Sequence, residues 1–230
     1  MIRKLIAGLA VIAIAAAAIQ TTGANRAEAQ GMDLQPGTSG YDFTLMDTQG
    51  NSHDLSDYTA DGKVVVLEWF NPGCPFVKKY YEGSNPSMKA AKAFAAENDV
   101  VWLAVNSGAP GKQGHGADTN NQYAAEHGIN NPILLDESGE VGRMFGAQNT
   151  PQLFIISEEG VLLFNGGVDE AKMDGEVPQH NYVIDALTQH MAGKDVDPSI
   201  TAHVGCSVKY GEKKPAAEGD MQPKNAQGAR

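Results

Sequence analysis

The spacing of apolar residues along the chain predicts strands that alternate with helices. Residues 41–55 alternate apolar and polar side chains around a Gln-Gly-Asn turn, which is typical of a hairpin. Residues 64–70 and 100–105 are almost continuously apolar, as expected of central strands that are buried on both faces. Residues 153–164 contain two short apolar runs around a Glu-Glu-Gly turn, and these predict a second hairpin.

Helices and one short strand are predicted between and after these segments. The last helix is amphipathic, with apolar residues on one face. Because strands and helices alternate before the second hairpin, the pattern predicts an α/β fold with a central mixed sheet covered by helices on both faces. Two predicted helices begin at Pro75 and Pro86, three more cover residues 118–127, 139–145 and 181–191, and the short strand is residues 133–135.

The first 29 residues have the pattern of a secretory signal peptide. Arg3 and Lys4 precede an apolar stretch, and Ala27 and Ala29 fit an A-x-A cleavage site. The stretch is shorter than the ~20 apolar residues that a membrane span needs, which favours a cleaved signal over an anchor. We therefore predict a periplasmic or secreted protein with no stable membrane insertion after cleavage.

Composition and charge indicate how the rest of the chain is organised and which partners it excludes. The formal net charge is −11, and an acidic chain of this kind is expected to repel nucleic acid. Residues 211–230 contain almost no apolar side chains, which predicts a disordered tail. What remains is a linker over 30–35, one domain over 36–193, and a C-terminal extension over 194–210.

Cys74 is the leading candidate for chemistry. It comes after the strand over 64–70 and an Asn-Pro-Gly turn, and Pro75 suits the first turn of a helix. At a helix start, free amide groups and the helix dipole favour the thiolate, which is the form that attacks disulfides and peroxides. We therefore predict that the Cys74 thiol is ionised and reachable. The chain has one other cysteine, Cys206, within a short patterned segment over 201–210.

The order of these features resembles the thioredoxin fold, and in particular the AhpC/TSA or redoxin branch with the periplasmic thiol-disulfide oxidoreductases of the TlpA type. The resemblance covers 36–192: the D-F-T-L-M-D hairpin, an aromatic pair before the turn, Cys74, and Thr150-Pro151 before the second hairpin. It implies a thiol-dependent oxidoreductase without a cofactor beyond its thiols. Its expected partners are an oxidised protein or small-molecule disulfide, or a peroxide, and an external thiol reductant.

The resemblance also implies roles for individual residues. Pro151 matches a cis-proline that faces the cysteine and lets the backbone of Thr150 pair with an extended substrate, which Pro75 and Phe76 are also expected to contact. Glu68 matches a buried acid that moves protons for the thiols. A carboxylate among apolar residues has its pKa raised by desolvation, which suits such a role. A strand-end or outward-facing glutamate without a role in catalysis is the alternative.

The chain departs from the family pattern at Val77, which stands where the second cysteine of C-x-x-C is expected. Either Cys206 or an external thiol must then resolve a mixed disulfide at Cys74. Cys206 also has two other interpretations, as half of a static structural disulfide in an inert binding module and as an unrelated free thiol.

Two further functions remain open. One is a peroxiredoxin-like hydroperoxide reductase with an antioxidant function, although Asn71 stands where peroxiredoxins carry a hydroxyl residue. The other is a non-enzymatic copper carrier using Cys74, Cys206 and His203 as soft ligands.

Overall fold

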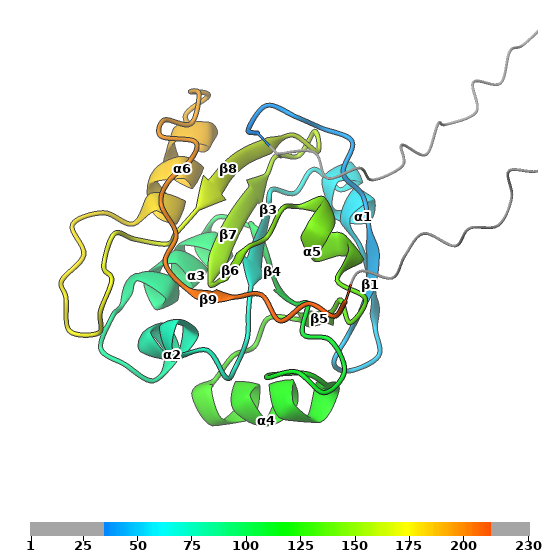
Figure 1. Cartoon of the computed structure of the whole chain (residues 1–230). Helices are drawn as coiled ribbons and strands as arrows, with labels where there is room; N and C mark the ends of the chain where they lie inside the picture. The colour runs from blue at the N-terminus through cyan, green and yellow to red at the C-terminus, as the bar shows by residue number, and fades with distance from the viewer. Residues whose placement is uncertain (1–34, 213–230) are drawn as a thin grey trace, which may run out of the picture. The chain divides into compact units, whose positions relative to one another are not determined.

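A seven-stranded mixed sheet forms the centre of the computed structural model, which describes residues 35–212 (Figure 1). The strand order is β2-β1-β5-β4-β3-β7-β8, in which β4 runs parallel to both β3 and β5 and the other neighbours are antiparallel. The strands are β1 (Thr44–Asp47), β2 (Ser52–Asp54), β3 (Val65–Trp69), β4 (Val101–Asn106), β5 (Ile133–Leu135), β7 (Gln152–Ile156) and β8 (Leu162–Gly166). A separate two-stranded sheet pairs β6 (Asn149–Thr150) with β9 (Cys206–Ser207).

Helices cover both faces of the sheet (Figure 1). On one face, α1 and α5 pack over Leu67 and Trp69 of β3; on the other, α3 and α6 pack over Val66. Every residue of β3 is buried, because alternate side chains enter the two apolar layers. The helices of the described region are α1 (Leu55–Ala60), α2 (Pro75–Tyr81), α3 (Ser87–Glu97), α4 (Ala117–His127), α5 (Glu140–Met144) and α6 (Tyr182–Met191).

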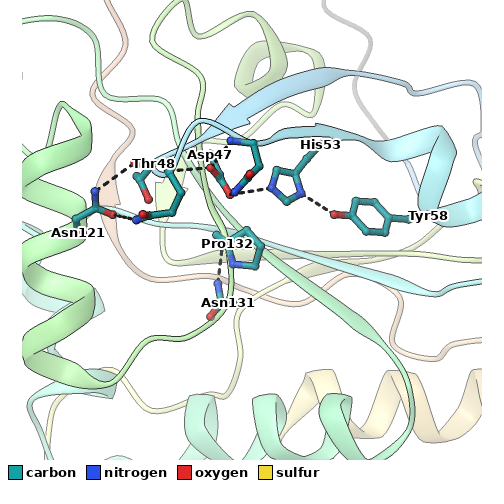
Figure 2. Close-up of polar contacts among 9 residues, drawn as sticks. Asp47, Thr48, His53, Tyr58, Asn121, Asn131 and Pro132 are labelled. Carbon is teal, nitrogen blue, oxygen red and sulfur yellow. Dashed lines mark hydrogen bonds and ion pairs between the residues drawn. The ribbon is translucent and has the colours of Figure 1, made fainter.

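The turn between β1 and β2 is organised around the buried carboxylate of Asp47 (Figure 2). Asp47 accepts hydrogen bonds from the backbone amides of Gln49 and Asn51 and lies 3.0 Å from Nε2 of His53, whose Nδ1 lies 2.6 Å from the Tyr58 hydroxyl. Burial alone would raise the pKa of Asp47, but the hydrogen bonds from His53 and its neighbours outweigh burial and lower it to about 2.

The same turn is also tied to α4. Asn121 of this helix accepts a hydrogen bond from the Gln49 side chain and donates one to the carbonyl of Thr48 (Figure 2). These contacts anchor the hairpin to the domain.

The predicted fold class is confirmed, and each predicted strand and helix of the domain is present with ends shifted by a few residues. The helix α1 was not predicted, because its six residues follow β2 directly and include just one buried side chain, Leu55. The predicted signal peptide, most of the linker and most of the tail lie outside the described residues. Within 35–212, no helix combines the length and apolar character that a membrane span requires.

Candidate active site around Cys74

The loop after β3 places Cys74 at the start of α2. Cys74 is the N-cap residue, with an extended backbone (φ −82°, ψ 122°) and Pro75 as the first helical residue. Its amide donates to the carbonyl of Asn71 over 3.0 Å, and the Asn71 side chain accepts from the amide of Gly73 over 2.8 Å. The Asn-Pro-Gly sequence thus forms a tight turn that leads from the end of the central strand β3 to the start of α2.

A second loop holds this turn in place. The side chain of Asn71 donates to the carbonyl of Gln113, and the side chain of Gln113 donates back to the carbonyl of Gly73. Gly114 allows the close approach: its φ is +77°, and a Cβ there would lie 2.2 Å from the Asn71 side-chain oxygen. The position of Cys74 is therefore fixed by the fold and does not depend on the helix alone.

The Thr150-Pro151 segment faces Cys74, as the resemblance implied. The Thr150-Pro151 peptide bond is cis. The Cys74 thiol donates a hydrogen bond to the carbonyl oxygen of Thr150 over 3.0 Å, although 76 residues separate the two along the chain. Both residues of this segment are buried.

Cys206 lies beside the same thiol. In the sheet formed by β6 and β9, Cys206 is the residue opposite Thr150, and it packs against the apolar cluster that contains Cys74. Both cysteines are free thiols. The segment over 201–210 therefore docks onto the domain next to Cys74.

The expectation of a directly reachable thiol is wrong for this arrangement. Cys74 is 0% exposed, whereas Cys206 is partly exposed. The residues around Cys74 include Phe70 and Val77 from its own loop and helix, and Cys206 from β9. The thiol is thus covered in part by a segment that lies far away in the sequence.

The two thiols have opposite pKa shifts. Burial alone would raise the pKa of Cys74, but hydrogen bonds from the Cys206 thiol and from the amides of Cys206 and Val77 outweigh burial and lower it. The pKa of Cys206 is raised to about 11, first by burial and then by its hydrogen bond and charge interaction with Cys74. Of the two thiols, Cys74 is therefore the one that ionises at the lower pH.

Glu68 has polar partners that the sequence pattern did not reveal. It is fully buried in β3, but its carboxylate accepts hydrogen bonds from the Tyr81 hydroxyl over 2.8 and 2.9 Å and from Nε1 of Trp102 over 2.9 Å. Nζ of Lys92 lies 3.4 Å from the carboxylate. The expected purely apolar setting is therefore wrong, because α2, α3 and β4 each contribute a polar group. Its predicted role in proton transfer stays a prediction.

Tyr81 connects Glu68 to the cysteine region. Its ring packs edge to face on Phe70 and Tyr123, and Phe70 and Tyr123 belong to the apolar cluster around Cys74. Burial, reinforced by the nearby Glu68 carboxylate, raises the pKa of Tyr81 well above its usual value, so this hydroxyl remains a donor. No simple sequence signal marks Tyr81, because an aromatic residue on a helix is most often a core residue.

Pro75 and Phe76 follow Cys74 in the first turn of α2. Pro75 is exposed and Phe76 is partly buried. Together with Lys78, Lys172 and Met173 they line a surface pocket of about 380 Å³ between α2 and the loop after β8. Their predicted contact with a substrate stays a prediction. Within the described region, no three His, Cys, Asp or Glu side chains come together as metal ligands.

The sequence and structure resemble known redox proteins. The Redoxin family pattern matches residues 35–184. The thiol-disulfide oxidoreductase ResA of Geobacillus thermodenitrificans is 30% identical over 124 residues, which are 54% of this chain and 64% of the relative's length. The ResA of Halalkalibacterium halodurans is 24% identical over 168 residues, or 72% of this chain and 89% of the relative.

Solved structures support the same fold. A hypothetical protein from Sinorhizobium meliloti superimposes with a TM-score of 0.68 and 24% identity, covering 79% of this chain and 97% of that chain. A proposed thiol:disulfide interchange protein DsbE from Chlorobium tepidum superimposes with a TM-score of 0.50 and 22% identity, covering 70% of this chain and 97% of that one. At these identities the structural likeness establishes the thioredoxin-like fold alone.

Proposed function

The chain belongs to the Redoxin family, and from this premise we propose that it is a thiol-disulfide oxidoreductase in which Cys74 is the attacking nucleophile. The observation that carries the proposal is the placement of Cys206 opposite Thr150, beside a Cys74 thiol whose pKa is lowered. A nucleophilic thiolate and a second thiol within the same site are the two groups that disulfide exchange requires.

The reaction would proceed in two exchange steps. The Cys74 thiolate attacks one sulfur of the partner's disulfide, forms a mixed disulfide with it, and releases the other partner sulfur as a thiolate that takes up a proton from solvent. Cys206, once deprotonated, attacks the Cys74 sulfur, forms the Cys74–Cys206 disulfide and releases the second partner thiol. Two electrons pass from the cysteine pair to the partner, and an external dithiol returns them.

The pKa values of the two thiols support this order of events. Part of the rise in the pKa of Cys206 comes from its hydrogen bond and charge interaction with Cys74. When Cys74 is held in a mixed disulfide it carries no negative charge, so that contribution is lost and Cys206 ionises more readily. Cys206 would thus become reactive once the mixed disulfide has formed.

Replacement of each cysteine tests the proposal. Cys74→Ser is expected to abolish reduction of a protein disulfide, and full retained turnover would overturn the mechanism. Cys206→Ser is expected to accumulate the mixed disulfide at Cys74, detected by mass spectrometry; a catalytic cycle unchanged by this replacement would remove Cys206 from the scheme. Parallel assays with hydrogen peroxide separate disulfide reduction from hydroperoxide reduction.

We also propose that the protein acts outside the cytoplasm. The support is the signal-like sequence of residues 1–29, which lies outside the described residues. Determination of the N-terminal residue of the protein recovered from its native cell tests this, with Gln30 as the expected start. Recovery of the uncleaved chain from the cytoplasm would contradict export.

A further inference from the structure

The segment over 199–211, here named the C-terminal strap, is fixed at both ends and crosses the active site in between. Figure 1 shows it in orange, running from the end of α6 past β6 toward α5. At its start, the amide of Asn165 donates to the carbonyl of Ser199 and the amide of Thr201 donates to the carbonyl of Asn165. At its end, the Tyr210 hydroxyl donates to the carbonyl of Ala147 over 2.8 Å.

The centre of the strap pairs with the backbone of Asn149 and Thr150 beside Cys74, here named the backbone edge. Cys206 and Ser207 pair with Thr150 and Asn149, and the Asn149 side chain donates to the carbonyl of Gly205 over 2.9 Å. This backbone edge is therefore filled by the chain itself. Any extended polypeptide that pairs with Thr150 would have to take the place of β9.

Gly205 makes the fit over Thr150 possible. A Cβ at residue 205 would lie 2.3 Å from the carbonyl oxygen of Thr150 and 2.7 Å from its carbonyl carbon, distances that real Cβ atoms do not adopt. The backbone of Gly205 does not have a positive φ, so the contact with Thr150 is what excludes a side chain. The strap therefore lies in close contact with the backbone of Thr150.

From these contacts, we propose that the C-terminal strap is a displaceable cover that competes with a partner polypeptide for the Asn149–Thr150 edge and thereby controls access to Cys74. The proposal rests on the proposed function in one respect, that the partner is an extended segment carrying an oxidised cysteine. The strap must leave for the mixed disulfide to form and must return for Cys206 to resolve it. A single segment would then both exclude partners and complete the reaction.

The way the strap is held fits this role. Most of its hydrogen bonds lie at its two ends, with Asn165 and Gly167 at the start and with Ala109, Arg143, Ala147 and Gln148 at the end. The centre is held by its pairing with β6 and by the Asn149 side chain, so it can separate from Thr150 without unfolding of the seven-stranded sheet. The pairing of β6 with β9 is limited to two residue pairs. Cys206 and Ser207 contribute no strand to the seven-stranded sheet, and their release leaves that sheet intact.

The test is the rate at which iodoacetamide alkylates Cys74 in the reduced full-length protein, followed by mass spectrometry of the Cys74 peptide. Gly205→Val forces the strap away from Thr150, and Tyr210→Phe removes an anchor remote from both thiols. We expect alkylation about tenfold faster in each, the change that follows when roughly one hydrogen bond of strap stability is lost. Ala202→Val, at an exposed strap position, is the matched control and is expected to keep the parent rate.

The outcomes separate the proposal from the function on which it rests. If Cys74 is alkylated at the parent rate in both Gly205→Val and Tyr210→Phe, the strap does not control access to Cys74 and the proposal is wrong. The proposal is also wrong if Cys74 of the parent protein is alkylated as fast as a cysteine in a free peptide. If Gly205→Val fails to fold, Tyr210→Phe decides alone, because it retains the aromatic ring. Alkylation requires no turnover, so a cover can be established or refuted even if Cys74→Ser shows that the proposed reaction is wrong.

Discussion

Replacement of Cys206 by alanine is expected to raise the pKa of Cys74 by about one unit. The Cys206 thiol is the largest of the hydrogen-bonding contributions that lower this pKa. A hydrogen bond to a charged group contributes roughly 1.5–3 kcal/mol, and one pKa unit corresponds to about 1.4 kcal/mol. The expected pKa shift is near the lower end of this range, because alanine admits water and weakens the burial that opposes ionisation of Cys74. The backbone amides of residue 206 and of Val77 also remain in place as donors.

Cys206→Ser is the matched control, because serine keeps a hydroxyl donor at the same position. The assay is the pH dependence of Cys74 alkylation, whose midpoint reports the pKa independently of any change in the maximal rate. The parent thiol ionises below its ordinary pKa, so the alanine profile should move to higher pH and the serine profile should move less. An unchanged or lowered midpoint in Cys206→Ala, or equal shifts in both variants, would refute the reasoning.

Three further results are expected. Lys92→Met leaves the buried carboxylate of Glu68 without its cation and should lower the free energy of unfolding by about 3 kcal/mol in urea titrations. Adding Glu68→Gln to this variant should restore part of the lost stability. A double variant no more stable than Lys92→Met would contradict the ion pair between Lys92 and Glu68. Asp47→Asn should lower the free energy of unfolding by about 2 kcal/mol at neutral pH, because the pKa of Asp47 is lowered from 3.8 to about 2 in the folded protein. Because the pKa of Asp47 is lower in the folded than in the unfolded state, its carboxylate stabilises the fold above the unfolded-state pKa, and this contribution is lost as the pH falls through about 2. The difference in unfolding free energy between parent and variant should therefore shrink on acidification. A difference that stays constant with pH would contradict this prediction. The reduction potential of the cysteine pair should lie above about −300 mV, the region of labile disulfides, whereas a lower value would indicate a structural bridge.

The fold could be predicted from the sequence largely because its strands leave strong patterns. The continuous apolar run of β3 arises from burial on both faces, and Asn71-Pro72-Gly73 followed by Pro75 marks the strand-to-helix turn. The helix α1 is short and mostly exposed, so its pattern carries little information.

The site could be predicted only in part. Cys74 and Thr150-Pro151 are marked by local sequence, and their contact follows from the resemblance. The pairing of Cys206 with Thr150 depends on a two-residue strand and on the absence of a side chain at Gly205, and neither leaves a periodic signal. The polar partners of Glu68 come from other elements, so its surroundings could not be inferred from its own strand.

The most direct test of the account is the state of the two cysteines after a single turnover. Reduced protein is mixed with an equimolar protein disulfide, quenched with acid at short times, digested and analysed by mass spectrometry. The account predicts a transient link between Cys74 and the partner, followed by a peptide pair joined through Cys74 and Cys206 that forms as the partner is released in its reduced state. Release of the reduced partner with Cys206 still a free thiol would contradict the central claim.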